Sequence, residues 1–299
     1  MVNATKSRHL NVPTFQTVFG VDFSGAAESG RNAWLAELTS PQPLDPENGD
    51  AKLQLTALAP LESLTGSPAR ADVNAFLVRR IRESEASFWG FDFPFGLPIE
   101  LALGDWEHQL DLVTAYDGNA KDFGRMLVET TEHRLGTKHV RRTTDKETQT
   151  PFDCYHYRII YQTFHGMRDV LAPIRNGDAV CVLPFQYEKL SGQKPDTVVV
   201  EACPSSTLKR LGLPHQNYKQ SGNKPPEENH KRTRRAILKT LTRFVEISPH
   251  RRRIIMNNPG GDALDAVLAG VGSWQGLTAT PHRDVANDAR YPLEGRVYC

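Results

Sequence analysis

The stretch "QTVFGVDFSGA" (residues 16–26) predicts the first strand of an α/β fold. Val18, Phe19 and Val21 favour β-structure and lie in one short apolar run, which is typical of a buried strand. The run ends at Asp22, where a glycine-containing segment predicts a turn. The first strand is therefore expected to present a carboxylate at its carboxyl end.

Two more strands are predicted directly after the first. They are "NAWLAELTS" (residues 32–40) and "KLQLTALAPL" (residues 52–61), separated by the turn-rich "PQPLDPENGD" (residues 41–50). Short apolar runs joined by such a turn favour an antiparallel meander. A helix is expected to follow, because Ser67 and Pro68 form a good N-cap and first-turn pair.

Two later strands also end in acidic residues. "FWGFDFPFGLP" (residues 88–98) predicts a fourth strand that ends at Asp92, and "DTVVVEACPSS" (residues 196–206) predicts a fifth that ends at Glu201. The chain between them, from about residue 99 to about residue 184, predicts a large and mainly helical insertion. We therefore expect an α/β fold with a mixed five-stranded sheet flanked by helices.

Length and composition predict one large globular domain. The chain has 299 residues, of which 39% are hydrophobic and 24% charged, which is enough apolar content for a full core. We expect residues 1–16 to be a disordered N-terminal segment and residues 17–299 to form the domain. No apolar run approaches the roughly 18 residues of a membrane span, and no secretion signal is evident. The four cysteines lack paired spacing, so a cytoplasmic protein without a zinc site or disulfide framework is predicted.

Basic residues are concentrated late in the chain. Between Pro204 and Met256 there are 13 lysines and arginines but only 3 acidic residues, although the whole chain has a net charge of only +1. Such asymmetry is compatible with a polyanion that crosses one face of the protein, and a nucleic acid is the obvious candidate. A basic helix that is simply solvated would give the same pattern.

The stretch "GGDALDAVLAG" (residues 260–270) predicts a helix with two carboxylates on one face. If the helix begins near Asp262, then Asp262 and Asp265 lie one turn apart, on a face that is otherwise alanine and glycine. Acidic residues in a first turn complement the helix dipole, which is one interpretation. The other is a binding site, since small residues would let the helix approach the strand ends closely. The strand-end acids favour the second interpretation.

Five acidic residues are therefore predicted to converge. In an open α/β sheet, residues at the carboxyl ends of neighbouring strands line a crevice where ligands bind. Converging carboxylates repel one another unless a cation lies between them, and hard oxygen ligands favour Mg²⁺ or Mn²⁺. Two such ions could support hydrolysis of a phosphodiester. The candidate catalytic residues are Asp22, Asp92, Glu201, Asp262 and Asp265.

Several motifs resemble those of the domain-of-unknown-function family 429, whose members are described as predicted nucleases of the RNase H-like fold. The motifs are "GVDFSGA", "GFDFPFGLP", "VVVEACPSSTLKRLGLP" with a later "YK", "GGDALDAVLAG", "EGRVY", and the region from "RRTTD" to "QTFHGMRDVL". The resemblance covers nearly the whole chain after about residue 17.

The order of the acids is also similar to that of Holliday-junction resolvases of the same superfamily. This likeness implies that Asp22, Asp92 and Asp265, together with Asp262, are metal ligands. One departure is that aspartate stands at position 92, where those resolvases commonly have glutamate. The resemblance thus implies an RNase H-like nuclease that uses Mg²⁺ or Mn²⁺ and acts on DNA or RNA.

Five further residues are candidates for substrate binding. The backbone amides of Ser24 and Gly25 follow Asp22 directly and could meet a phosphate. Arg141 and Arg142 could contact a phosphate, unless nearby acidic charge neutralises them. Lys219, in the "YK" pair, could stabilise charge beside the acidic cluster or could be an ordinary surface lysine.

The insertion also contributes aromatic residues. They either pack the insertion internally or offer surfaces on which nucleic-acid bases stack. Cys203 has no histidine at a recognisable spacing, which argues against a thiol nucleophile. The aromatic residues in question are Tyr155, Tyr157, Tyr161 and Phe164.

Three functions remain open on the sequence alone. The leading hypothesis is a divalent-metal-dependent nuclease, motivated by the acidic residues and the basic segment. A nucleotide-binding ATPase or sugar-kinase-like protein of the same fold is an alternative, although only "NNPGGDA" offers a second glycine-rich phosphate loop. The third possibility is a nucleic-acid-binding protein without turnover.

Overall fold

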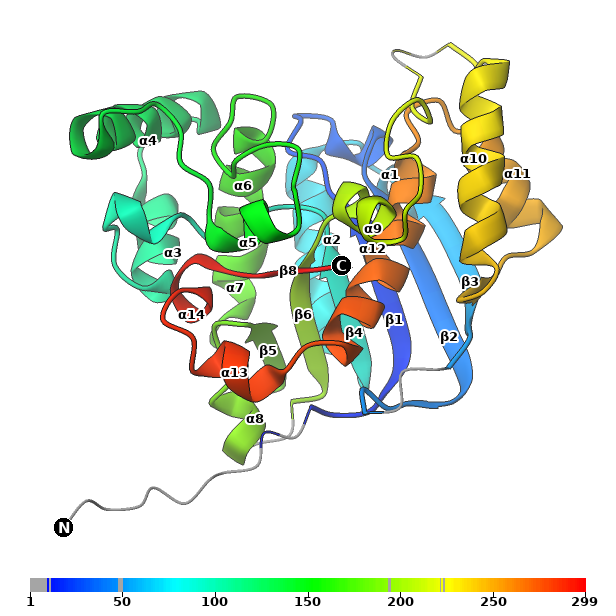
Figure 1. The fold of residues 1–299 in the computed structure, drawn as a ribbon, viewed down its shortest axis with the longest axis horizontal. Coiled ribbons are helices and arrows are strands. Elements are labelled where there is room, and N and C mark those ends of the chain that lie inside the picture. Colours follow the sequence, from blue (N-terminus) through cyan, green and yellow to red (C-terminus); the bar gives the residue numbers. More distant parts are fainter. Residues whose placement is uncertain (1–9, 11, 48–50, 193–194, 221, 223) are drawn as a thin grey trace.

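The protein is built around one mixed eight-stranded sheet with helices on both faces (Figure 1). The computed structural model describes residues 10, 12–47, 51–192, 195–220, 222 and 224–299. The strands lie in the order β5-β6-β4-β1-β2-β3-β7, and β8 pairs with β6. They are β1 (Phe15–Asp22), β2 (Trp34–Leu44), β3 (Leu53–Pro60), β4 (Ser87–Phe91), β5 (Val180–Leu183), β6 (Thr197–Ala202), β7 (Val245–Glu246) and β8 (Val297–Tyr298).

The five predicted strands are present, but the sheet is larger than expected. β1, β2 and β3 form the predicted antiparallel meander, and β4 and β6 continue the sheet parallel to β1. The prediction of five strands is wrong because β5, β7 and β8 add to the edges. β7 and β8 have two residues each, and strands this short carry no periodic signal in a sequence.

The insertion is helical, as predicted, but ends earlier than expected. It holds η2 (Ile99–Leu101), α3 (Trp106–Ala115), α4 (Ala120–Leu135), α5 (Thr143–Glu147), α6 (Ile160–Gly166), η3 (Met167–Leu171) and α7 (Ala172–Ile174). The chain then enters β5, which belongs to the sheet, so the predicted boundary near residue 184 lies too late.

The start of the domain also differs slightly from the prediction. β1 begins at Phe15, which is fully buried, so the ordered domain starts before residue 17. Most of the predicted N-terminal segment, residues 1–9 and 11, lies outside the described residues. No helix in the described ranges is both long enough and apolar enough to cross a membrane.

The remaining helices cover the two faces of the sheet. They are η1 (Ser29–Arg31), α1 (Leu61–Thr65), α2 (Arg70–Glu83), α8 (Lys189–Gly192), α9 (Pro204–Arg210), α10 (Glu228–Leu241), α11 (Pro249–Asn257), α12 (Asp262–Thr278), α13 (His282–Ala286) and α14 (Tyr291–Glu294). One core lies between the sheet and α12, with α10 and α11 beside it. The other core lies between the sheet, α2 and the helical insertion.

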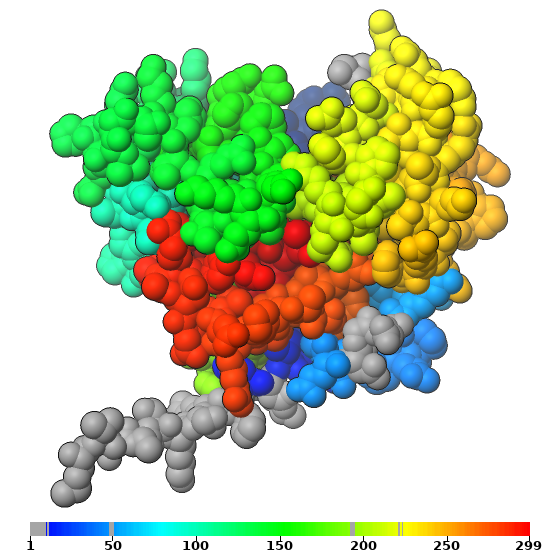
Figure 2. Space-filling model, viewed as in Figure 1, coloured from blue at the N-terminus to red at the C-terminus, as the bar shows by residue number. Residues whose placement is uncertain are grey.

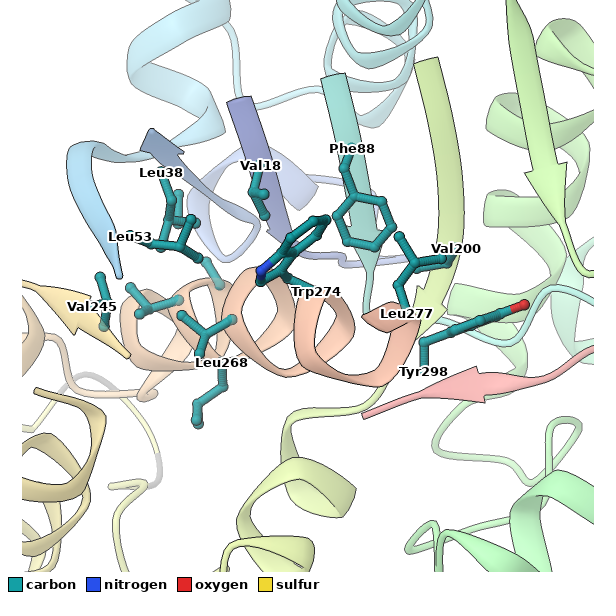
Figure 3. Close-up of a cluster of buried hydrophobic side chains, with 14 of the residues drawn as sticks. Val18, Leu38, Leu53, Phe88, Val200, Val245, Leu268, Trp274, Leu277 and Tyr298 are labelled. Carbon is teal, nitrogen blue, oxygen red and sulfur yellow. The ribbon is translucent and has the colours of Figure 1, made fainter. Parts of the chain in front are cut away.

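The helix α12 begins at Asp262, as predicted, but is buried on nearly all sides. Trp274 points from α12 toward the sheet and packs edge-on against Phe88 at 5.9 Å between ring centroids, whereas Leu268 points away from it (Figure 3). The apolar residues opposite the sheet therefore pack against the neighbouring helices, and the helix is not an amphipathic surface helix.

Backbone contacts bring α12 unusually close to the central strands. A Cβ atom at Gly20 of β1 would lie 2.0 Å from the carbonyl oxygen of Ala266, and one at Gly90 of β4 would lie 2.6 Å from that of Ala269. Only glycine fits at such positions. The predicted small-residue face of the helix therefore does lie against the sheet, and glycines in the strands complete the contact.

Candidate active site

Asp22 and Asp92 end two neighbouring parallel strands at the same level. Val21 pairs with Phe91 between β1 and β4, and the next backbone amide, that of Asp92, donates to the Val21 carbonyl at 2.9 Å. Successive side chains alternate across a sheet. Because Gly20 and Gly90 both face α12, the side chains two residues later, those of Asp22 and Asp92, lie on the α12 side as well.

The first turn of α12 brings two more carboxylates to the same place. Asp265 is 1% exposed, and its charge acts on both Asp22 and Asp92. Asp262 is partly buried and interacts with Asp22. Four of the five predicted acidic residues are therefore neighbours at one end of the central strands.

Lys219 joins this group from the loop that precedes α10. Its amine forms an ion pair with the Asp265 carboxylate, and the hydroxyl of Tyr218 donates to the other oxygen of that carboxylate at 2.9 Å. Asp265 therefore has two partners within the protein, and Lys219 is a charge partner of the acidic cluster rather than an isolated surface lysine. We call Asp22, Asp92, Asp262, Asp265 and Lys219 the acidic cluster.

The electrostatics of the acidic cluster show an excess of negative charge. Burial, and then the charge of Asp265, raise the pKa of Asp92 to about 7. The same two causes raise the pKa of Asp22 well above its usual value. Burial alone would lower the pKa of Lys219, but Asp265 outweighs it and raises that pKa. One lysine therefore does not compensate the carboxylates fully.

Glu201 is held by other partners than the acidic cluster, although its charge contributes to the raised pKa of Asp92. It pairs with Phe91 in the register of β6 and β4, so its side chain lies on the side of the sheet that faces the insertion. There its two oxygens accept hydrogen bonds from Arg142 at 2.6 and 2.8 Å, and the Phe95 amide donates to it at 2.9 Å. The prediction of a catalytic role for Glu201 is therefore replaced by a structural one.

Arg142, which the sequence predicts to contact a phosphate, lines the pocket beside Asp92 but binds carboxylates of the protein itself. Arg142 is completely buried, and its guanidinium also donates to Asp145 at 2.8 and 3.1 Å. Because the guanidinium is buried and already binds the carboxylates of Glu201 and Asp145, it has no surface exposed to a ligand. Arg141 is partly exposed, but it donates to the carbonyls of Thr150 and Pro151 at 3.1 and 3.2 Å.

Ser24 and Gly25 lie where the sequence predicts them, in the loop directly after Asp22. Within the described part of the chain neither of their backbone amides donates a hydrogen bond, and Ser24 is partly exposed whereas Gly25 is buried. Gly25 has a packing role too, because a Cβ atom there would lie 2.3 Å from the Tyr161 carbonyl carbon in α6. The loop is thus held against the insertion.

A pocket of about 210 Å³ opens beside the acidic cluster. Asp92 and Lys219 form part of its wall, and Phe152 and Ile159 of the insertion form another part. Cys203 also lines it, but burial, followed by the charge of Asp92, raises the pKa of its thiol to about 12. This agrees with the expectation that Cys203 is not a nucleophile.

Arg234 is a site-supporting residue that the sequence prediction counted only as part of the basic segment. It is completely buried and donates to the Tyr218 carbonyl at 2.7 Å and to four carbonyls between Ile255 and Pro259. These bonds join the loop that carries Lys219 to the loop that leads into α12. The signal was present, because Arg234 falls on the same helical face as Ile237, Leu238 and Leu241.

The described residues contain no group of three or more His, Cys, Asp or Glu side chains whose atoms are arranged to hold a metal ion. Asp265, a predicted ligand, is instead paired with Lys219 and Tyr218. The four cysteines are all free thiols.

Comparisons of this chain with protein-family models, with curated proteins and with solved structures found no match.

Proposed function

We propose that the protein is a divalent-metal-dependent nuclease of RNase H-like type, with its active site at the acidic cluster. The observation that carries this proposal is the state of Asp22 and Asp92. Both side chains face other carboxylates, and within the described chain neither accepts a hydrogen bond. Asp22 is 8% exposed and Asp92 is partly exposed, and crowded carboxylates without donors are unfavourable unless a cation compensates them.

The donor set fits Mg²⁺ or Mn²⁺. Carboxylates from Asp22, Asp92 and the first turn of α12 lie together there beside the Lys219 amine, and hard cations prefer oxygen ligands. We assign Asp22, Asp92 and Asp265 as the ligands and Asp262 as a nearby supporting carboxylate. When bound, the metal supplies positive charge that stabilises the developing charge of a phosphodiester transition state.

Other groups of the chain have distinct roles in this proposal. The free amides of Ser24 and Gly25 would bind a phosphate oxygen of the substrate next to Asp22. Lys219 offsets the charge of Asp265 and lies half-exposed beside the pocket, so it could also contact a phosphate bound there. A phosphodiester bound there would thus meet donors on two sides.

The surface around the acidic cluster supports a nucleic-acid substrate. The helical insertion, in green, and the α10 segment, in yellow, rise on opposite sides, with the dark blue of the N-terminal part between them (Figure 2). On α10, Arg232, Arg235 and Lys239 are exposed, and Arg235 is the one of the three that forms an ion pair with a described residue, Glu228. Exposed cations of this kind attract phosphate backbones.

The arrangement of the strands supports the RNase H-like part of the proposal. The sheet begins with an antiparallel meander and continues with strands parallel to the first, and a helix with a D-x-x-D pair crosses one face. The sequence resemblance implies this order of elements.

A cleavage assay tests the proposal. Labelled single-stranded and double-stranded DNA and RNA are incubated with the protein in Mg²⁺, Mn²⁺ or EDTA. Cleavage is expected only with metal. Asp22→Asn or Asp265→Asn should reduce it by at least about a hundredfold, because the loss of a residue that merely supports a metal ligand already costs up to about that much, and these two residues are assigned as ligands. The matched control is Asp117→Asn, an exposed aspartate in the insertion. Full activity of either site variant, or activity in EDTA, would contradict the proposal.

A second candidate, a nucleic-acid-binding protein without turnover, is favoured by the ion pair of Lys219 with Asp265. A lysine that occupies a carboxylate in this way can replace a cation. Calorimetric titration with Mn²⁺ separates the two functions: binding that Asp22→Asn abolishes supports the nuclease, whereas nucleic-acid binding without any Mn²⁺ binding supports the second candidate.

A further inference from the structure

The insertion carries a surface pocket with exposed tyrosines. Tyr157 is 69% exposed and Tyr161 is 43% exposed, although large aromatic side chains are usually buried. Together with Lys121, Arg125 and His139 they line a pocket of about 440 Å³, which we call the tyrosine pocket. Tyr155 also lines the tyrosine pocket but is only 1% exposed, and Phe164 is fully buried and packs the insertion.

Tyr157 is held in place despite its exposure. Its ring lies 4.4 Å from that of His156, which in turn stacks on Phe152 at 4.5 Å with an angle of 20° between the planes. Arg158 donates to the Tyr157 hydroxyl at 3.1 Å, and its guanidinium lies 5.6 Å from the ring centroid. A ring fixed in this way loses little conformational entropy when a ligand stacks on it.

The charges of the tyrosine pocket favour an anionic ligand. Its lining includes two cationic side chains and a histidine but no acidic residue. Arg125 is paired with Asp122 at the rim, at 3.4 Å, and His139 contacts Asp153 at 3.1 Å, whereas Lys121 is exposed and forms no ion pair with a described residue. Flat aromatic surfaces beside positive charge are the features that bind unpaired nucleic-acid bases and their phosphates.

The start of α6 connects the tyrosine pocket to the loop that follows Asp22. The Tyr161 backbone packs directly against Gly25, in the loop that follows Asp22. The next residue, Gln162, donates from its side chain to the Phe23 carbonyl at 2.6 Å. A chain that lies across Tyr161 can therefore continue toward Asp22.

We propose that the tyrosine pocket binds a single-stranded stretch of nucleic acid, whose bases stack on Tyr157 and Tyr161 while Lys121 and Arg125 attract its phosphates. The bases of a duplex are stacked on one another and do not present these faces, so the stretch must be unpaired. The proposal rests on the proposed nuclease function, because it identifies the form of substrate that this site receives.

Binding measured without cleavage tests the proposal. Fluorescence anisotropy is recorded in EDTA with labelled single-stranded DNA and RNA of roughly 10 to 15 nucleotides, within the range of known single-strand sites. Tyr157→Ala and Tyr161→Ala should each weaken binding roughly 5- to 100-fold, the range for loss of one stacked base. Tyr157→Phe and Tyr161→Phe keep the ring and should bind almost as wild type does. Leu64→Ala removes an equally exposed apolar side chain outside the tyrosine pocket and should have no effect.

Charge and strandedness provide two further readouts. Lys121→Gln should reduce the dependence of affinity on salt, since one fewer phosphate contact is made. A blunt duplex of the same sequence should bind without dependence on either tyrosine. Equal affinity of the alanine variants and wild type for single strands would overturn the proposal. So would tyrosine-dependent self-association of the protein in sedimentation experiments without single-strand binding.

The outcome for the tyrosine pocket is separable from that for the nuclease. If the protein binds single strands through the tyrosines but cleaves nothing with any metal, the proposed role of the tyrosine pocket is supported and the proposed nuclease function is rejected. If cleavage depends on metal and its KM is unchanged in Tyr157→Ala and Tyr161→Ala, the proposed nuclease function is supported and the proposed role of the tyrosine pocket is rejected. If both are correct, the tyrosine variants raise KM and change kcat little, because the rings bind substrate away from the reacting phosphate.

Discussion

Lys219 forms an ion pair with Asp265, which joins the loop before α10 to the first turn of α12. The Asp265 carboxylate is buried, whereas the lysine is half-exposed. The ion pair therefore neutralises one carboxylate of the acidic cluster while leaving the lysine in contact with solvent. Replacement of Lys219 should affect metal binding and stability in opposite directions.

The first prediction concerns Lys219→Gln. Without the amine, Asp265 is free to bind a cation, so the affinity for Mn²⁺ should rise. In EDTA the variant should be less stable than wild type by about 1–3 kcal/mol, between the values for exposed and buried ion pairs. Titration calorimetry and denaturant unfolding measure the two effects, with Lys224→Gln as an exposed control in the same loop. Unchanged Mn²⁺ affinity would show that the ion pair does not compete with a metal.

The second prediction concerns pH. The pKa of Asp92 is raised from 3.8 to about 7 by burial and by Asp265, so ionisation costs the folded state more than the unfolded state. Wild-type stability in EDTA should therefore fall as the pH rises from about 4 to about 7. Asp92→Asn should remove much of this loss and be more stable than wild type at pH 7 by about 2 kcal/mol or more. Thermal unfolding at several pH values measures the difference, and a wild type more stable than Asp92→Asn at pH 7 would contradict it.

The third prediction concerns the contact between β1 and α12. In Gly20→Ala the new methyl group would lie 2.0 Å from the Ala266 carbonyl oxygen, so the helix must move. We expect a destabilisation of about 2 kcal/mol or more and a loss of Mn²⁺ affinity, because Asp265 moves with the helix. Gly177→Ala is the matched control, since its methyl group would have no contact closer than 3.5 Å. Equal stability of the two variants would contradict the predicted displacement.

The fourth prediction tests the assignment of Arg142 as structural. Arg142→Met leaves Glu201 and Asp145 buried without their shared partner, which should cost about 3–5 kcal/mol in the free energy of unfolding. Nuclease activity per folded molecule should change little. The double variant with Glu201→Gln should recover part of the stability. Arg141→Met, at the neighbouring and partly exposed position, should cost less, and a selective loss of activity in Arg142→Met would restore a catalytic role to Arg142.

The central part of the fold is predictable from sequence because its strands are apolar runs bounded by turns. The segments around Val18, Leu38, Leu55, Phe88 and Val199 all form the predicted strands. β5 escaped prediction because its four residues lie at the end of a long helical region, with no alternation to distinguish them. Tertiary contacts determine which segments add strands at the edges of the sheet, and these contacts leave no local pattern in the sequence.

The acidic cluster is predictable in part. Asp22, Asp92 and Asp265 are near enough for the charge of Asp265 to raise the pKa of both other carboxyl groups, because the strand ends and the first turn of α12 fall at one edge of the sheet. Glu201 lies apart from them, because side-chain alternation turns it to the other face, in register with Phe91. The partner of Glu201 could not be foreseen either, since Arg142 comes from a distant part of the chain and no sequence pattern links the two.

The backbone contact of Gly20 and Gly90 with α12 has a consequence for how this protein can evolve. Elsewhere in the core, side chains such as Val18 and Leu268 fill the space between elements, and substitutions there change the spacing between those elements. At Gly20 the nearest atoms all belong to the helix backbone, and at Gly90 they are the Ser273 side chain and the Ala269 carbonyl oxygen, so neither position has room for a side chain of its own. A substitution at either glycine would therefore displace the helix that carries Asp265 from the strands that lead to Asp22 and Asp92, so both glycines must remain while the rest of the core changes.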